Sequence, residues 1–244
     1  ENKSVVLRYN KTKTGKLKIH MVNEPDMYTR LLRQPLFQGM SKTDIHNIIA
    51  HTKFGFNKFK DGETIVKDGS VCNKLIFLTN GKIKATRYSD DHGYAFSEEL
   101  AAPEILQPEH IFGLNQRYTY TFTASGSCNL ITLDKNETLR LSDEFIIFRL
   151  NLLNIITTQT QKITHKWWLA KPTDLRRRIV RFFESHCRKP AGAKTIHIKM
   201  ERLAEELNDN RLNISRELNK MQSEGLLQLR RAIIHIPSLE KLMM

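Results

Sequence analysis

Residues 200–236 read MERLAEELNDNRLNISRELNKMQSEGLLQLRRAIIHI, and this stretch decides the fold of the C-terminal third of the chain. Leu203, Ala204 and Leu207 are spaced for the buried face of a short helix. Asn208 belongs to a residue type that tolerates a left-handed backbone, and Ile214 begins the buried face of a second helix. The small side chain of Ala204 lets the two helices cross closely. The pattern predicts a helix-turn-helix.

Short β-rich runs lie on both sides of these helices. TIHI at 195–198 predicts one strand, and LLQL at 226–229 with IIHI at 233–236 predicts a hairpin that turns at Arg230-Arg231. A helix-turn-helix with a hairpin behind it is a winged helix. We therefore predict a winged-helix domain over residues 172–244.

Charge is distributed unevenly along the 244 residues. Lys and Arg number 39 against 26 Asp and Glu, a net charge of +13. Residues 1–50 carry 9 basic and 4 acidic side chains, residues 51–171 carry 15 and 13, and residues 172–244 carry 15 and 9. A basic C-terminal third favours a polyanionic partner such as nucleic acid. The nearly neutral centre indicates a separate task for that region.

The N-terminal half alternates turns and short strands. Ser41 precedes Asp44 in a capping-box-like spacing, which predicts a short helix there. Asp-Gly at 61–62 and 68–69 and Asn-Gly at 80–81 then separate runs rich in β-forming residues. Repeated signals of this kind predict hairpins in a small β-barrel or jelly roll.

A long helix with two apolar stripes is predicted to follow. One stripe contains Phe145, Phe148, Leu152 and Ile155, and the other contains Ile146, Leu153, Ile156, Thr160, Ile163 and Trp167. One interpretation is a core helix within a single domain. The favoured one is a helix that packs on its own β-domain with the first stripe and on a second copy with the other, because the pattern runs about 25 residues. Lys171 before Pro172 ends the helix.

These segments, in this order, resemble the Crp/Fnr family of bacterial transcription regulators. The resemblance rests on PLFQGMS at 35–41, FKDGETI at 59–65, LIFLTNGKI at 75–83, the long helix and NRLNISRELNKMQSEGLL at 210–227. It implies an α+β fold with a cyclic-nucleotide-binding-like β-roll (double-stranded β-helix or jelly-roll) sensor domain at 1–142, a dimerisation helix and hinge at 143–171, and a winged helix at 172–244. It also implies a cytoplasmic homodimer that binds double-stranded DNA and meets RNA polymerase.

The second helix of the winged helix is expected to read bases in the major groove. The residues expected to contact base edges are Arg211, Leu212, Asn213, Ser215 and Arg216, and those expected to contact phosphates are Lys199, Arg202, Lys220, Arg230 and Arg231. Family members often have Glu where this chain has Leu212. Leucine cannot accept a hydrogen bond from cytosine but can contact a thymine methyl, so we expect a shifted recognition sequence. Lys199 stands where the family usually has Thr or Ser.

Residues 110–125, HIFGLNQRYTYTFTAS, fall where relatives that bind cyclic nucleotides place a Glu for the ribose and an Arg for the phosphate. Here Leu114 replaces the Glu and Arg117 stands one residue early, which turns its side chain to the other face of a strand. We expect no cyclic AMP binding by the family's usual contacts. Another small molecule would use a cavity in the roll, whose expected lining is Leu114, Arg117, Thr119, Thr121, Thr123 and Thr164. The alternative is that these residues simply alternate across a strand.

Metal and haem sites receive no support from the sequence. Cys72, Cys128 and Cys187 form no CxxC spacing, and the histidines at 20, 46 and 92 show no ligand spacing. We expect reduced thiols and no metal, and the sequence identifies no cofactor or effector.

The sequence also bears on whether the protein is a membrane protein, an exported protein or an enzyme. The most apolar run, residues 145–156, is interrupted by Arg149, Asn151 and Asn154, so no membrane span is predicted, and no export signal opens the chain. The first residue is Glu1 rather than Met, which is compatible with a truncated or processed start and a missing segment before it. No catalytic constellation stands out, which disfavours an enzyme. A general nucleic-acid-binding structural protein is the main alternative to a regulator.

Overall fold

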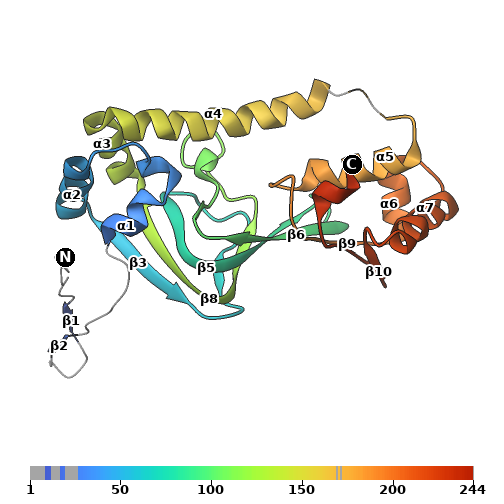
Figure 1. The fold of residues 1–244 in the computed structure, drawn as a ribbon, viewed down its shortest axis with the longest axis horizontal. Helices are drawn as coiled ribbons and strands as arrows, with labels where there is room; N and C mark the ends of the chain where they lie inside the picture. The colour runs from blue at the N-terminus through green and yellow to red at the C-terminus, as the bar shows by residue number, and fades with distance from the viewer. Residues whose placement is uncertain (1–8, 12–16, 20–26, 169, 171, 244) are drawn as a thin grey trace.

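The computed structural model describes residues 9–11, 17–19, 27–168, 170 and 172–243, and the predicted fold is present in them (Figure 1). The first described elements are an antiparallel pair, β1 (Tyr9–Lys11) and β2 (Leu17–Ile19). Helix α1 (Met27–Leu32), the 3-10 turn η1 (Pro35–Phe37) and α2 (Lys42–His51) follow. Ser41 caps α2 by accepting a hydrogen bond from the Asp44 amide at 3.1 Å, which confirms the predicted helix start.

The N-terminal domain is a β-roll built on two long, bent strands that pair antiparallel, β5 (Lys74–Tyr88) and β8 (Thr121–Asp134). Its apolar interior forms one core cluster, to which α1, α2 and the following helices contribute. The roll consists of β3 (Phe54–Phe59), β4 (Thr64–Val66), β5 (Lys74–Tyr88), β6 (Tyr94–Ala101), β7 (Glu104–Ile105), the 3-10 turn η2 (Pro108–His110) and β8 (Thr121–Asp134).

The prediction of a hairpin turn at Asn80-Gly81 is wrong. Strand β5 runs through both residues, and its register with β8 shifts on either side of Asn80. Gly81 has a φ of 89°, and a Cβ at this position would lie 2.5 Å from the Ser127 carbonyl oxygen. The dipeptide therefore forms a bulge that bends the strand rather than a turn that ends it.

Two helices follow the roll where the sequence predicted one. Helix α3 (Lys135–Glu144) is capped by Asp134 and ends at Phe145, and α4 (Ile146–Trp168) then crosses the roll (Figure 1). Phe148 and Leu152 are buried in the roll's core. Ile156 also packs against that core, although we placed it on the outer stripe.

The C-terminal domain is a winged helix with its own core cluster. Asn208 has the predicted left-handed backbone, with a φ of 47°, and Ala204 and Ile214 are buried where the helices meet. The elements are α5 (Leu175–His186), β9 (Lys194–Ile198), α6 (Met200–Leu207), α7 (Arg211–Ser223), β10 (Gln228–Arg230), β11 (Ile233–Ile236) and the 3-10 turn η3 (Leu239–Leu242).

One sheet passes through both domains, which the sequence did not predict. Its strand order is β10-β11-β9-β6-β5-β8-β3, so β9 of the winged helix lies directly beside β6 of the roll (Figure 1). Beyond this path, β4 pairs with β8 and β7 pairs with β5. The two domains are therefore joined by backbone hydrogen bonds as well as by the chain between α4 and α5.

Candidate nucleic-acid interface

The turn before α7 is held by a small polar network. Asn210 caps α7 by accepting from the Asn213 amide at 2.8 Å. Arg178 of α5 donates to the Leu207 carbonyl oxygen at 2.8 Å and forms an ion pair with Asp209. The hydrogen bonds that Asp209 accepts from Asn213 and Arg178 lower the pKa of its carboxyl group. These contacts fix the angle at which α7 leaves α6.

The C-terminal end of α7 is anchored to α5 by a two-pronged ion pair. Arg176 donates from Nη1 and Nη2 to the two carboxylate oxygens of Glu224, at 3.0 and 2.6 Å. This bond lowers the pKa of the Glu224 carboxyl group and raises that of the arginine. Because both ends of α7 are tied to the domain, its outer face is presented as a rigid surface.

That outer face carries most of the residues expected to contact bases. Leu212 is 68% exposed, Arg216 is exposed, and Ser215 is half-buried between them. Asn219 lies on the same face, one turn further on, and donates to the Ser215 carbonyl oxygen at 2.8 Å. Sequence reasoning missed Asn219, although its i+3 and i+4 spacing from Arg216 and Ser215 would have placed it there.

Two of the expected base contacts already have protein partners. Arg211 is exposed, and its Nε lies 3.2 Å from a carboxylate oxygen of Glu201 on α6. The Asn213 amide group donates to Asp209 at 3.0 Å as part of the turn network. Arg211 would have to leave an exposed ion pair to reach DNA, which costs little, whereas Asn213 would disturb the turn.

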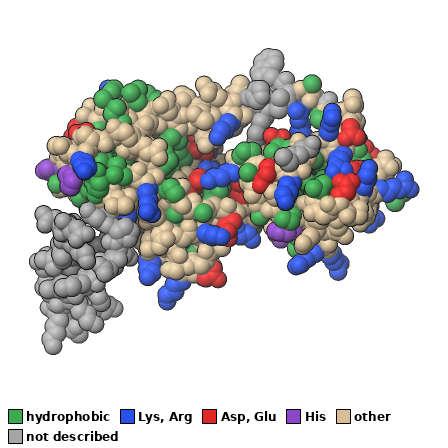
Figure 2. All heavy atoms as spheres, viewed as in Figure 1, with side chains coloured by type: hydrophobic (Ala, Val, Ile, Leu, Met, Phe, Trp, Pro, Cys, Tyr) green, Lys and Arg blue, Asp and Glu red, His purple; other side chains and the backbone are tan. Residues whose placement is uncertain are grey.

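The residues expected to contact phosphates surround this face. Lys199 is exposed at the N-cap of α6, and Lys220 is exposed on α7. Arg230 is exposed at the end of β10, and Arg231 is exposed in the turn that follows it, so the turn of the wing lies one residue later than predicted. Figure 2 shows Lys and Arg side chains, interspersed with Asp and Glu, at the end of the molecule formed by α6, α7 and the wing. This arrangement suits a backbone-following interface that supplies affinity without sequence information.

Arg202 differs from the other expected phosphate contacts. Its guanidinium forms ion pairs with Asp91 at 2.9 Å, Glu206 at 2.7 Å and Glu205 at 3.5 Å. Asp91 belongs to the β5–β6 turn of the roll, so the partner comes from the other domain. In this arrangement Arg202 is neutralised by protein carboxylates.

We expected the threonines at 119, 121 and 123 to face a cavity inside the roll. The structure instead turns the aromatic side chains of this segment towards the interior. Tyr118, Tyr120 and Phe122 are buried in the roll's core, because aromatic side chains gain more by burial than threonine hydroxyls do. The alternating threonines face the other way. Thr119 accepts from Gln107 at 2.7 Å, and Thr121 accepts from the Asp68 amide at 3.1 Å.

Three of the other expected pocket residues are exposed. Leu114 is fully exposed, and Arg117 donates to the Gly69 carbonyl oxygen at 2.7 Å on the outside of the roll. Thr164 lies exposed on α4, where its hydroxyl donates to the Thr160 carbonyl oxygen at 2.9 Å. Leu114, Arg117 and Thr164 therefore lie on the surface rather than in a buried cavity.

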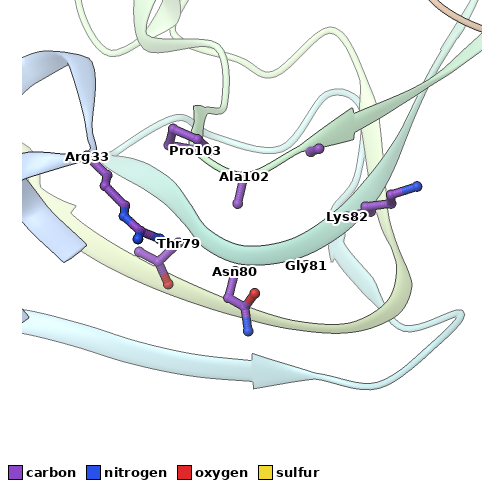
Figure 3. A pocket seen from close by; sticks show the side chains of 8 residues that line it. Arg33, Thr79, Asn80, Gly81, Lys82, Ala102 and Pro103 are labelled. Atoms are coloured by element: carbon purple, nitrogen blue, oxygen red, sulfur yellow. The ribbon is translucent and has the colours of Figure 1, made fainter. Parts of the chain in front are cut away.

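A hollow of about 320 Å³ lies elsewhere on the roll, at the bulge of β5 (Figure 3). Thr79, Asn80 and Gly81 form one side, and Ala102 with Pro103 form another, while Arg33 reaches in from the segment after α1. Lys82 also lines the hollow, but its ammonium group pairs with Glu99 at 2.6 Å. The lining is thus mostly small and uncharged, and it differs from the one that the sequence predicted.

Two family models match the chain, in the order found for the two domains. A cyclic nucleotide-binding domain model matches residues 56–145, and a Crp-like helix-turn-helix domain model matches residues 177–244. The second match covers α6, α7 and the wing, which are the elements of the interface described above.

Solved structures of bacterial regulators resemble the chain along most of its length. The Catabolite Activator Protein of Thermus thermophilus has a TM-score of 0.51 and 17% sequence identity, over 86% of this chain and 97% of that one. The c-di-GMP responsive regulator CLP of Xanthomonas campestris has a TM-score of 0.46 and 17% identity, over 81% of this chain and 99% of that one.

Curated relatives share a shorter region. The potassium channel SKOR of Arabidopsis thaliana is 31% identical over 125 residues, and the channel KOR1 of rice, Oryza sativa subsp. japonica, is 26% identical over 132. These matches take in 49% and 52% of this chain, and the chain spans only 14% of the length of either channel.

The β-roll, the crossing helix and the winged helix together define a two-domain architecture with a cyclic nucleotide-binding fold and a Crp-like helix-turn-helix. A cyclic nucleotide-binding domain followed by a Crp-like helix-turn-helix is the architecture of the Crp/Fnr family. The Crp-like helix-turn-helix supports a DNA-binding transcription regulator.

Among the described residues, no helix combines the length and apolar character needed to cross a membrane. Within the same residues, the structure groups no three His, Cys, Asp or Glu side chains where they could hold a metal ion.

Proposed function

We propose that the protein is a sequence-specific transcription regulator that binds double-stranded DNA as a homodimer in the cytoplasm of a bacterium. The observation that carries this proposal is the exposed face of α7, where Leu212, Ser215 and Arg216 lie on a helix fixed at both ends. A rigid helix with a free polar and apolar face is what base reading in the major groove requires.

The outer stripe of α4 supports the homodimer. Ile146, Leu150 and Leu153 are each about half exposed and lie at steps of four and three residues. Thr157, Thr160 and Thr164 continue this stripe in exposed positions. Leu150 was not among the predicted dimer residues, whereas Ile156 was and faces the roll. The side chains of Ile163 and Trp167, also predicted for this stripe, lie outside the described residues.

The proposal includes RNA polymerase as a partner, on the strength of the family architecture. It assigns no effector. Leu114 points to solvent and Arg117 is bonded to Gly69, so the usual carboxylate and guanidinium contacts of a bound cyclic nucleotide have no counterpart in these two residues. We propose that cyclic AMP is not sensed through those contacts.

Selection of bound sites from a pool of random duplexes tests the function. We expect one palindromic motif to be enriched, and binding to it about a thousandfold tighter than to random sequence at roughly 150 mM salt. Because Leu212 replaces a hydrogen-bond acceptor, the half-site should differ from the family's commonest one. Recovery of that commonest half-site would contradict the role given to Leu212.

A matched pair of variants separates base reading from phosphate contact. Arg216→Ala should relax the selected motif at one position per half-site, whereas Lys220→Ala, one turn further on, should weaken binding to all sequences alike. Equal binding of the wild-type protein to selected and random duplexes would favour a general nucleic-acid-binding protein instead.

A further inference from the structure

The winged helix is docked on the edge of the roll by strand pairing. Strand β9 runs antiparallel to β6, with Tyr94 opposite Ile198 at one end and Glu98 opposite Lys194 at the other. The wing strand β11 continues the sheet on the far side of β9. The DNA-binding domain is therefore held in one orientation relative to the sensor domain.

Aromatic packing reinforces this docking. Phe96 and Tyr94 of β6 pack in the winged helix's core rather than in the roll's. The Phe96 ring stacks on His186 with centroids 4.8 Å apart, and the Tyr94 hydroxyl lies 3.1 Å from Nε2 of the same histidine. Separation of the domains would expose both aromatic side chains of the roll.

A buried ion pair lies at the end of the paired strands. The Lys194 ammonium group donates to Glu98 at 2.6 Å, and the two side chains are only 2% and 4% exposed. The same carboxylate accepts from the backbone amides of Arg188 and Lys189, at 2.7 and 3.2 Å. All three donors belong to the C-terminal domain, so the burial of Glu98 is compensated only while the winged helix is docked.

Further ion pairs join the segment after α5 to the roll. Arg188 lies 3.9 Å from Glu104 and 3.6 Å from Glu109, and its guanidinium stands over the Tyr120 ring. Lys189 pairs with Glu104 at 2.6 Å. Basic side chains of the DNA-binding domain are thus matched by carboxylates of the sensor domain.

One of these contacts touches the expected DNA-binding surface. The β5–β6 turn places the Asp91 carboxylate 2.9 Å from the Arg202 guanidinium on α6, where a DNA phosphate was expected to bind. Ser89 and the Gly93 amide donate to Asp91, and these bonds, together with Arg202, lower the pKa of its carboxyl group. The turn presents a fixed negative charge beside the first helix of the helix-turn-helix.

We propose that this docked arrangement is a state of low DNA affinity, in which the β5–β6 turn occupies Arg202, and that release of β9 from β6 raises the affinity. The inference rests on the proposed function for its DNA readout. Docking brings carboxylates of the sensor domain onto Lys194, Arg188, Lys189 and Arg202, which lowers the positive charge available to a polyanion.

A disulfide between the paired strands tests the proposal in the full chain. Ala95 and His197 are directly opposite each other, so their side chains share a face, and either type of antiparallel pair has a Cα separation that a disulfide can span. The Ala95→Cys/His197→Cys variant should form this cross-link under mild oxidation. The native cysteines should not compete with the introduced pair, because they are buried. The two single-cysteine variants are the controls.

The oxidised double variant should bind a 30-base-pair duplex of random sequence about tenfold more weakly than the same protein after reduction, because phosphate contacts are lost. Equal affinities before and after reduction would overturn the proposal, as would failure of the cysteines to cross-link. Binding by neither form would refute the proposed function itself, and the cross-link yield would still report docking.

A charge-matched pair of variants isolates the Arg202 contact. Asp91→Asn and Asp90→Asn remove the same charge from the same exposed turn, but only Asp91 pairs with Arg202. We expect Asp91→Asn to raise affinity for the random duplex about threefold more than Asp90→Asn does, the scale of one exposed ion pair. Identical effects of the two substitutions would show that the turn does not occupy Arg202.

Discussion

At the scale of single residues, Glu98 and Glu99 are neighbours in β6 that have opposite surroundings. Glu98 is buried against Lys194 of the winged helix, whereas Glu99 is 45% exposed and pairs with Lys82 of its own domain. Successive strand residues face opposite sides of a sheet, so the two carboxylates cannot exchange roles.

The Glu98→Gln substitution should lower the free energy of unfolding by about 3 kcal/mol, because it leaves a buried ammonium group without its counter-charge. Glu99→Gln is the matched control and should cost less than about 1 kcal/mol, as exposed pairs do. Chemical denaturation of the two variants and the wild-type protein measures both values. Similar losses in the two variants would contradict the role assigned to the buried pair.

Residues with local requirements were predictable from the sequence. Asn208 has the left-handed backbone, Ser41 caps its helix, and Ile214 is buried, because each depends on near neighbours in the chain. The partners of Glu98 and Arg202 were not predictable. Both contacts join residues about a hundred positions apart, and no periodicity in the sequence records which strand edges meet.

At the scale of secondary-structure elements, α4 has two faces with different surroundings. Phe148 and Leu152 are buried against the roll, while Ile146, Leu150 and Leu153 are exposed on the other side. The two stripes were predictable from spacing, but the assignment of Ile156 was not. It lies between the stripes, so the angle at which α4 crosses the roll decides its side.

The Leu153→Lys substitution should convert the proposed dimer to a monomer, because it places a charge in the centre of the apolar stripe. Thr158→Lys adds the same charge at an exposed position of α4 that lies off the stripe, and it should leave the dimer intact. Sedimentation velocity of both variants distinguishes the outcomes. A Leu153→Lys protein that remains dimeric would place the dimer interface elsewhere.

One strand differed from its prediction because the same dipeptide occurs both in hairpin turns and in bends of a continuous strand. Asn-Gly at 80–81 is typical of a hairpin turn, yet here it bends a continuous strand. The separate helix α3 was missed because residues up to 142 were assigned to the β-roll and the long helix was predicted to begin only at 143; the extended backbone at Phe145 divides α3 from α4.

At the scale of the whole molecule, acid should affect the winged helix through two carboxylates with lowered pKa values. Hydrogen bonds from Ser238 and the backbone amides of Glu240 and Gly192 lower the pKa of Glu240 from 4.5 to about 2, and contacts with Asn213 and Arg178 lower that of Asp209. A depressed pKa in the folded state stabilises the fold above the unfolded-state pKa.

This contribution should be complete above about pH 4.5 and should disappear as the pH falls towards 2. Thermal unfolding followed by circular dichroism between about pH 6 and pH 2.5 should therefore show a declining Tm in that window. Glu240→Gln should lower the Tm at the upper end of this range and flatten the decline. A variant with the same pH dependence as the wild-type protein would exclude Glu240 from this effect.

The sheet shared by both domains also determines how the protein can be divided. A polypeptide that ended after α4 would lack β9, and the edge of β6 would then present unpaired backbone groups beside Tyr94 and Phe96. Such an edge is a template for pairing with another chain. The isolated sensor domain should accordingly aggregate through β6 more readily than the full chain does.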